Sequence, residues 1–137
     1  MATLTLEIVT PESLAYSEVI DSVVIPTTDG EVGILPMHVP LMTELQPGEL
    51  RITKSGSEES VMAIGYGFAE VVSDKVLVLT DAAVNEGDID ETATEDAIAR
   101  AKKALEDKDL GSEEMAAVEA ALQRSLAQLR VKRRRRH

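Results

Sequence analysis

Cysteine and tryptophan are absent from this sequence, and the only aromatic residues are Tyr16, Tyr66 and Phe68. Without cysteine there can be no disulfide bonds and no zinc site with thiolate ligands. So few rings argue against a surface that stacks the bases of single-stranded nucleic acid. No apolar run approaches the roughly 18 residues of a membrane-spanning helix. The N-terminus lacks the basic and then apolar pattern of a signal peptide, so we expect synthesis in the cytoplasm.

Charge is unevenly distributed along the chain. The formal net charge is −11, yet the final run RVKRRRRH contains six Lys or Arg and no acid. Cations at the end of a helix suit the negative pole of its dipole, and a solvated helix end is the simplest interpretation of this run. A basic tail on an acidic body is also typical of proteins that bind nucleic acid, an anionic surface or an acidic partner protein.

The first half of the sequence has the period of β-strands. In TLTLEIVTP the apolar residues Leu4, Leu6 and Ile8 alternate with polar ones, and this period of two is typical of a half-buried strand. Clusters of turn-forming residues separate further strand-like runs. The pattern continues to about Val84 and predicts an antiparallel sandwich or barrel. The predicted turns lie at 26–30, 54–57 and 73–74.

The second half changes to helical spacing after a polar linker, NEGDIDE, at 85–91. Asp90 or Thr92 is the expected N-cap of a first helix, and Thr92 with Glu95 has the spacing of a capping box. Gly111 is expected to end this helix in the left-handed conformation, and Ser112 to start a second helix. The predicted apolar faces are Ala93, Ala97, Ala101, Ala104 and Leu105 on the first helix, and Met115, Val118, Leu122, Leu126 and Leu129 on the second.

These two segments predict an antiparallel two-helix hairpin whose first helix has a face of alanine. Alanine buries little apolar area, and at about 25 cal/mol per Å² it contributes much less than leucine. A hairpin of this kind is marginally stable by itself. We therefore expect it to dock in one place or to swing to another.

The sequence contains no recognisable catalytic or metal-binding constellation. A phosphate-binding G-x-x-x-x-G-K-[ST] loop is absent, and Gly65-Tyr66-Gly67 is too short for a dinucleotide fingerprint. We interpret it as a kink in a strand, where backbones approach closely. The carboxylates of the linker lack the residue order of a calcium-binding loop, so linker charge is the better interpretation.

His38 lies in an apolar segment, EVGILPMHVPLM, between Pro36 and Pro40. No nucleophile stands near it at a spacing typical of hydrolases. A hydrogen-bonded structural histidine and a histidine in a protein interface are both favoured over a catalytic or metal-binding role. We expect the start of the segment to be anchored in the sandwich through Val32, Ile34 and Leu35.

Three segments together have the pattern of a known family. GEVGILPMHVPLMTELQPGELRI is similar to G-x-x-G-(I/V)-(L/Y)-P-x-H-x-P-(L/I)-x-(T/A)-x-(L/I)-x-x-G, and GYGFAEVVSDKVLVLTDAA to G-G-F-x-E-V-x-x-x-x-V-x-V-L-x-D-x-A. LAQLRV is similar to a common ending of the second helix, and LTLEIVTPE also fits. The chain thus resembles the epsilon subunit of F-type ATP synthases over nearly its whole length. The resemblance implies a sandwich of about ten strands at 1–85 and a regulatory helical hairpin with a basic end at 86–137.

The resemblance further implies a non-catalytic rotor subunit of the central stalk. Its sandwich would bind the gamma subunit and the c-ring, and its hairpin would regulate or inhibit ATP hydrolysis in the alpha and beta head. It implies a peripheral place on the cytoplasmic face of the bacterial plasma membrane, with no nucleic acid partner and membrane contact only through the c-ring. The residues it assigns to the c-ring and gamma interface are Glu31, Gly33, Pro36, His38 and Pro40, and those it assigns to the regulatory tail are Arg130, Lys132, Arg133, Arg134, Arg135 and Arg136.

The sequence departs from the family where some members bind ATP through an (I/L)-D-x-x-R-A motif. The matching stretch, IDETAT, keeps Ile89 and Asp90 but has Ala93 in place of the arginine. Because this removes the main counter-charge for phosphate, we expect weak or no ATP binding and no cofactor. Arg100 and Arg124 remain as candidate phosphate ligands.

Composition leaves a second class of function open, an acidic stand-alone binding module with a basic tail for nucleic acid or anionic surfaces. The two interpretations predict different surfaces. A rotor subunit needs an exposed apolar patch on one face of its sandwich, whereas the stand-alone module needs its tail and little else. A small hydrolase using His38 ranks last.

Overall fold

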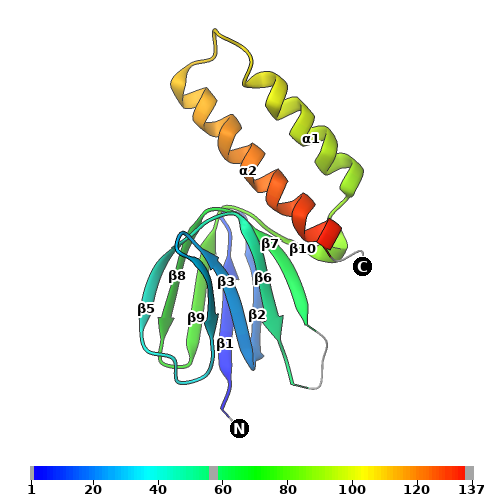
Figure 1. Cartoon of the computed structure of the whole chain (residues 1–137). Helices are drawn as coiled ribbons and strands as arrows, with labels where there is room; N and C mark the ends of the chain where they lie inside the picture. Colours follow the sequence, from blue (N-terminus) through cyan, green and yellow to red (C-terminus); the bar gives the residue numbers. More distant parts are fainter. Residues whose placement is uncertain (1, 56–58, 135–137) are drawn as a thin grey trace.

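The computed structural model describes residues 2–55 and 59–134, and it shows a β-sandwich with two helices at one end (Figure 1). The described residues form ten strands, then a short 3-10 helix and two α-helices. The predicted fold class is therefore confirmed. The strands are β1 (Leu4–Val9), β2 (Leu14–Ile20), β3 (Ser22–Thr27), β4 (Gly30–Ile34), β5 (Leu41–Leu45), β6 (Gly48–Thr53), β7 (Ser60–Ile64), β8 (Gly67–Val72), β9 (Lys75–Thr80) and β10 (Ala83–Asn85).

The strands pair in the order β10-β7-β6-β3-β5-β8-β9-β1-β2, with β4 on β3. One pair departs from the expected antiparallel pattern, because β1 lies parallel to β9, with Thr5 opposite Lys75 and Val9 opposite Leu79. The other pairs among the described strands are antiparallel. Parallel neighbours cannot be joined by a tight turn. Here the connection from β1 to β9 is the whole stretch of sequence that contains β2 to β8.

The core between the layers is filled almost entirely by aliphatic side chains. Leu4, Leu6 and Ile8 are at most 1% exposed, as their alternation in the sequence predicts. They pack with Val, Ile and Leu residues from β3 to β9, and Tyr16 is the half-buried ring that touches this core. Burial and the nearby Glu18 carboxylate raise the pKa of Tyr16. Each buried methylene contributes about 0.8 kcal/mol, so a core with few rings can still be well stabilised.

The turns follow the sequence prediction in part. The β8–β9 turn is at Ser73 and Asp74, as predicted, and Ser73 takes a positive φ of 55°. The turn predicted at 26–30 is shorter, because Pro26 is still part of β3. Thr27 closes that turn, since its hydroxyl donates to the carbonyl of Gly30 at 2.6 Å. Of the turn predicted at 54–57, residues 56 and 57 lie outside the described residues.

The first helix, α1 (Glu91–Ala104), follows the 3-10 helix η1 (Glu86–Asp88). Asp90 is its N-cap, and the Asp90 carboxylate accepts a hydrogen bond from the Ala93 N–H at 3.0 Å. The alternative cap at Thr92 and the predicted capping box are wrong, because Thr92 already lies inside the helix. The predicted face is also shifted: Ala93 is exposed, while Thr94 and Ile98 are the buried residues.

The connection between the helices differs from the predicted tight turn. α1 ends at Ala104, and α2 (Ser112–Arg134) begins at the predicted Ser112. Gly111 does not end α1 in the left-handed conformation, so that prediction is wrong. Its carbonyl instead accepts a hydrogen bond from the Met115 N–H at 2.8 Å. Gly111 thus provides the first acceptor in the hydrogen-bond pattern of α2.

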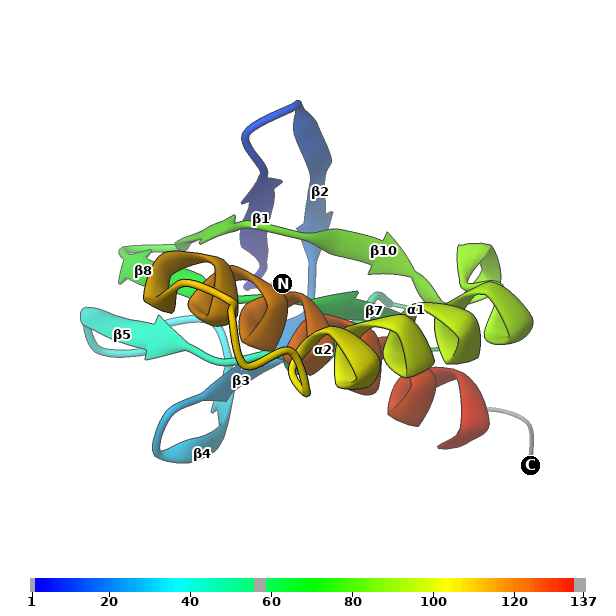
Figure 2. The same cartoon turned by 90° about the horizontal axis from the view of Figure 1, so that it is seen from above.

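α2 lies between α1 and the sandwich (Figures 1 and 2). It contacts β6, β7 and η1, while α1 packs along α2. A small apolar cluster of Val61, Ala63, Ile89 and Val131 joins α2 to the sheet, separately from the main core. Neither helix in the described part of the chain is both long and apolar enough to cross a membrane.

Candidate partner-binding surfaces

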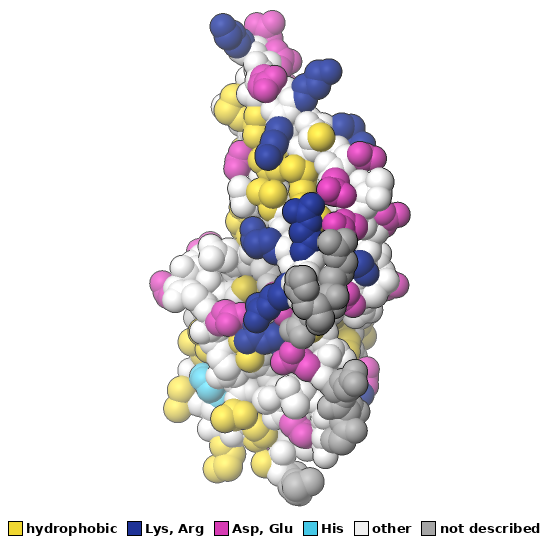
Figure 3. Space-filling model, turned by 45° about the vertical axis from the view of Figure 1, so that its right-hand side comes forward, with side chains coloured by type: hydrophobic (Ala, Val, Ile, Leu, Met, Phe, Trp, Pro, Cys, Tyr) yellow, Lys and Arg dark blue, Asp and Glu magenta, His cyan; other side chains and the backbone are white. Residues whose placement is uncertain are grey.

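The loop after β4 presents apolar side chains to solvent. Met37 is 84% exposed and Val39 71% exposed, and Leu35, predicted to anchor the segment, is 64% exposed. That prediction is wrong for Leu35, although Ile34 is fully buried and Val32 packs against the core. The backbone strain of the loop is at Met37, where φ is +70°. Figure 3 shows apolar side chains, in yellow, to the left of and below the cyan histidine on the sandwich.

His38 is bonded within this loop. Its N–H donates to the carbonyl of Leu35 at 3.1 Å, and its ring Nδ1 lies 2.6 Å from the carbonyl of Val39. Because a carbonyl oxygen only accepts, Nδ1 carries the proton. In the neutral ring Nε2 is then the acceptor. The ring is thus fixed by its own loop, which fits either a structural or an interface role.

A second apolar surface covers the outer face of β5, β8 and β9. Phe68 is 56% exposed and Met42 69% exposed, and Phe68 lies opposite Leu79 in the β8–β9 register. These side chains and Leu77 line a shallow hollow of about 90 Å³. Sequence reasoning missed this surface. The signal was the alternation in β8, where the small Ala69 faces the core and the large Phe68 faces outward.

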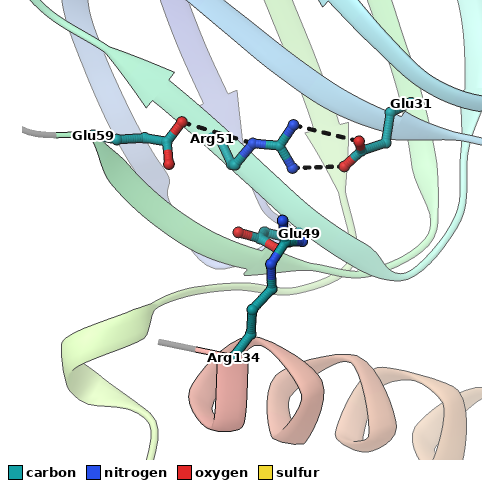
Figure 4. Close-up of polar contacts among 5 residues, drawn as sticks. All are labelled: Glu31, Glu49, Arg51, Glu59 and Arg134. Carbon is teal, nitrogen blue, oxygen red and sulfur yellow. Dashed lines mark hydrogen bonds and ion pairs between the residues drawn. The ribbon is translucent and has the colours of Figure 1, made fainter. Parts of the chain in front are cut away.

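A cluster of charges surrounds Arg51 on β6 (Figure 4). The Arg51 guanidinium donates two hydrogen bonds to the Glu31 carboxylate, at 2.7 and 3.3 Å. Its Nε lies 3.7 Å from Glu59. The hydrogen bond from Arg51 holds the pKa of the Glu31 carboxyl below its ordinary value of 4.5, and it raises the pKa of Arg51 in return. Glu31 is therefore held ionised and oriented by a paired guanidinium.

Replacement of Arg51 by glutamine is expected to return the pKa of Glu31 toward its ordinary value. The lowered pKa belongs to the folded state, so the pair stabilises the fold above the pKa of the unfolded carboxyl, and this contribution is lost as pH falls through the folded pKa. Carboxyl ¹³C NMR titration measures the shift. Lys54→Gln is the control, because Lys54 pairs with Glu18 and should leave Glu31 unaffected. An unchanged Glu31 titration in Arg51→Gln contradicts this assignment.

The basic end of α2 lies on acids of the chain itself. Arg134 pairs with Glu49 on β6 at 2.7 Å. Arg133 reaches two acids of α1, Glu91 and Glu95, and Lys132 reaches Glu86 of η1. Arg130 is exposed. The predicted tail residues Arg135 and Arg136 lie outside the described residues.

The structure brings together a residue predicted for the c-ring and gamma interface and two residues predicted for the regulatory tail. Glu31, Arg130 and Arg134 line one cavity of about 270 Å³ between α2 and the sandwich. Glu31 is at the start of β4, near the end of the helices, whereas His38 is in the loop beyond the other end of that strand. Gly33 is exposed in β4, and Pro36 and Pro40 flank His38.

The four residues predicted for a weak ATP site are engaged in different ways. Ile89 is buried in the cluster with Val131, and Asp90 caps α1. Arg124 pairs with Asp81, next to β9, at 3.0 Å, and Arg100 is exposed on α1. Among the described residues, no three His, Asp or Glu side chains gather in a group that could hold a metal ion.

Two family models match almost the whole chain. The beta-sandwich domain of the ATP synthase delta/epsilon chain matches residues 3–86, and the long alpha-helix domain of the same chain matches residues 88–133. The ATP synthase epsilon chain of Herpetosiphon aurantiacus is 44% identical over 132 residues, which cover 96% of each chain. That of Dehalococcoides mccartyi is 43% identical over 136 residues, covering 99% of this chain and 96% of the relative.

Solved structures share the fold. A chain of the Euglena gracilis mitochondrial ATP synthase superposes with a TM-score of 0.76 at 24% identity, over 93% of this chain and 79% of that one. A chain from the central stalk and c-ring structure of the Tetrahymena thermophila mitochondrial ATP synthase gives a TM-score of 0.60 at 10% identity, over 94% and 96% of the two chains. At these identities the likeness concerns the arrangement of strands and helices.

Proposed function

Because the chain belongs to the delta/epsilon-chain family of ATP synthases, we propose that it is the non-catalytic epsilon subunit of the central stalk. In this role it couples rotation of the c-ring, through gamma, to ATP synthesis. Residues 1–85 are the stalk-binding domain and residues 86–137 the regulatory hairpin. As a peripheral component of the enzyme it lies on the cytoplasmic face of the bacterial plasma membrane, and it reaches the membrane only through the c-ring.

The observation that carries this proposal is the exposed apolar surface on the sandwich. The outer face of β5, β8 and β9 holds Met42, Phe68 and Leu79, and the loop after β4 adds Met37 and Val39. Apolar patches of this kind on a small domain mark protein-binding sites. We assign the outer face to gamma, and the loop with Pro36, His38 and Pro40 to gamma and the c-ring. We assign Glu31 and Gly33 of β4 to the contact with gamma and the c-ring as well, with Glu31 at the opposite end of that strand from the His38 loop.

Capture of the tagged full-length chain from cells that carry its own ATP synthase tests the assignment. Gamma and the c-ring should be retained with it, at moderate salt, because the contact is mainly apolar. Nucleic acid retained in their place would favour the stand-alone binding module. The exposed apolar surface on the sandwich favours the epsilon subunit, since the stand-alone module needs its tail and little else.

We further propose that α2 carries an inhibitory element for the alpha and beta head. The cations of its final turn, Lys132, Arg133 and Arg134, form ion pairs in which at least one partner is partly exposed to solvent, and partly exposed pairs are weak. An acidic surface of a partner can therefore compete for them. Attraction of this kind weakens as salt is added, so inhibition should be salt-sensitive.

Deletion of residues 131–137 is expected to raise ATP hydrolysis by the whole complex several-fold. The measurement is steady-state ATPase activity of purified enzyme at low and at high salt. Val131 is buried in the docked hairpin, so a second variant keeps it and replaces Lys132, Arg133 and Arg134 by glutamine. Hydrolysis that stays at the wild-type rate in both variants argues against an inhibitory tail.

A further inference from the structure

One face of α2 is built to dock on the sandwich. Arg124, Ala127, Val131 and Arg134 are spaced by three, four and three residues, which places them on one side of a helix. Ala127 and Val131, in the middle, are 1% and 2% exposed. Arg124 and Arg134, at the two ends, pair with Asp81 and Glu49 of the sandwich at 3.0 and 2.7 Å. The face thus has a small apolar centre and a cation at each end.

Gly65, between β7 and β8, lies directly beneath Arg124. A Cβ atom added to Gly65 would lie 2.0 Å from Oδ1 of Asp81, and 3.0 and 3.2 Å from Cδ and Cγ of Arg124. The backbone of Gly65 has no positive φ that requires glycine. Its missing side chain instead makes room for the ion pair, because the atoms that a methyl group would displace belong to Asp81 and Arg124.

The turn that carries Asp81 is fixed by buried hydrogen bonds. The Thr80 hydroxyl is 3.1 Å from the N–H of Gly65, from which it accepts, and the Asp81 N–H donates to the carbonyl of Tyr66 at 2.9 Å. Thr80 is only 5% exposed. Gly65, in the β7–β8 connection, and Asp81, in the β9–β10 connection, are thereby held side by side, and the carboxylate of Asp81 has a defined place to meet the helix.

We propose that Gly65, Asp81 and Arg124 form a latch that sets the docked position of α2, with Gly65 as its positioning residue. The ion pair is partly exposed, the Arg124 side chain by 30% and that of Asp81 by 39%, so it is readily broken and remade. The apolar area beside it is small, since Ala127 and Val131 are short side chains. The latch follows from these contacts alone, whereas its use in regulation rests on the proposed function.

Hydrogen–deuterium exchange on the full-length chain tests the latch. In Gly65→Ala the amides of α2 near residues 122–131 should exchange about ten-fold faster, and those of β1 and β9 should keep their wild-type rates. Asp81→Asn and Arg124→Gln should each speed the exchange of the same α2 amides by about two- to five-fold. The double variant Asp81→Arg with Arg124→Asp should restore protection. Gly87→Ala and Arg100→Gln are the controls, because Gly87 has nothing within 4 Å of an added Cβ and Arg100 is exposed.

Wild-type exchange of α2 in Gly65→Ala, or an equal rise in the sandwich strands, overturns the latch. The regulatory use is measured separately, as ATP hydrolysis by the whole enzyme that carries Gly65→Ala. A released hairpin should lower hydrolysis by making the inhibitory element available. Faster exchange of α2 with unchanged hydrolysis leaves the latch in place and counts against the proposed inhibitory function.

Discussion

Replacement of Phe68 by aspartate is expected to weaken binding of the chain to gamma by at least about a hundred-fold. Phe68 is a large ring on the outer face of β5, β8 and β9, where it lines a hollow together with Met42 and Leu79. A carboxylate at that place has to lose its water in any apolar interface, and none of the described residues that line the hollow is a cation that could pair with it. The substitution therefore weakens the complex with gamma and leaves the fold intact, because Phe68 points away from the core.

The measurement is the dissociation constant of the purified full-length chain for gamma, with circular dichroism to establish that the variant is folded. Met115→Asp is a matched control, since Met115 is also an exposed apolar residue, 43% exposed, but lies at the start of α2. It should bind gamma as the wild type does. Wild-type affinity in Phe68→Asp would show that gamma binds elsewhere on the sandwich.

Replacement of Gly67 by alanine should lower the free energy of unfolding by about 3 kcal/mol. A Cβ atom on Gly67 would lie 1.8 Å from the carbonyl oxygen of Leu79 and 2.8 Å from Cα of Thr80. Both are backbone atoms of the neighbouring strand β9, so the two strands must separate. This is the difference from Gly65 two residues earlier, where the displaced atoms belong to the side chains of Asp81 and Arg124.

Urea denaturation at constant pH measures this effect. Gly33→Ala in β4 is the control, because nothing lies within 4 Å of its added Cβ, and its free energy of unfolding should change by no more than about 0.5 kcal/mol. Equal stability of the Gly67→Ala variant and the wild type would mean that β8 and β9 can move apart at little cost. The kink predicted within a strand at Gly65-Tyr66-Gly67 is instead the connection between two strands, because β7 ends at Ile64 and β8 begins at Gly67. The close approach of backbones that was predicted there is found at Gly67.

Local patterns predicted much of the fold. The alternation of Leu4, Leu6 and Ile8, the turn at 73–74 and the cap at Asp90 each depend on residues close together in the chain, and each is confirmed. The family membership, predicted from longer motifs, is confirmed by the match to the two domain models. Local chemistry is sufficient for features of this kind because the interactions that decide them are local.

Features that depend on contacts between distant residues could not be predicted. The pair Glu31–Arg51 joins β4 to β6, and neither residue signals the other in the sequence. α2 has apolar or small residues on two faces. The spacing of its leucines predicted one of these faces, and the face with Ala127 and Val131, which docks on the sandwich, was not predicted. In α1 the many alanines fit several faces almost equally, so Thr94 and Ile98 were missed. The assignments of the loop, of Glu31 and of the tail to partner proteins stay predictions.

The parallel pairing of β1 with β9 sets the order in which the chain is able to fold. Thr5 pairs with Lys75, so β1 has to wait for a partner strand that is synthesised 70 residues later. Until then β1 is held only by its hairpin with β2, and two-stranded hairpins are marginal in water. Closure of the sandwich is therefore a late, long-range event, which is slow compared with helix formation. The hairpin of α1 and α2 follows the sandwich in the chain, so its docking site on β6 and β7 is already synthesised when α2 leaves the ribosome.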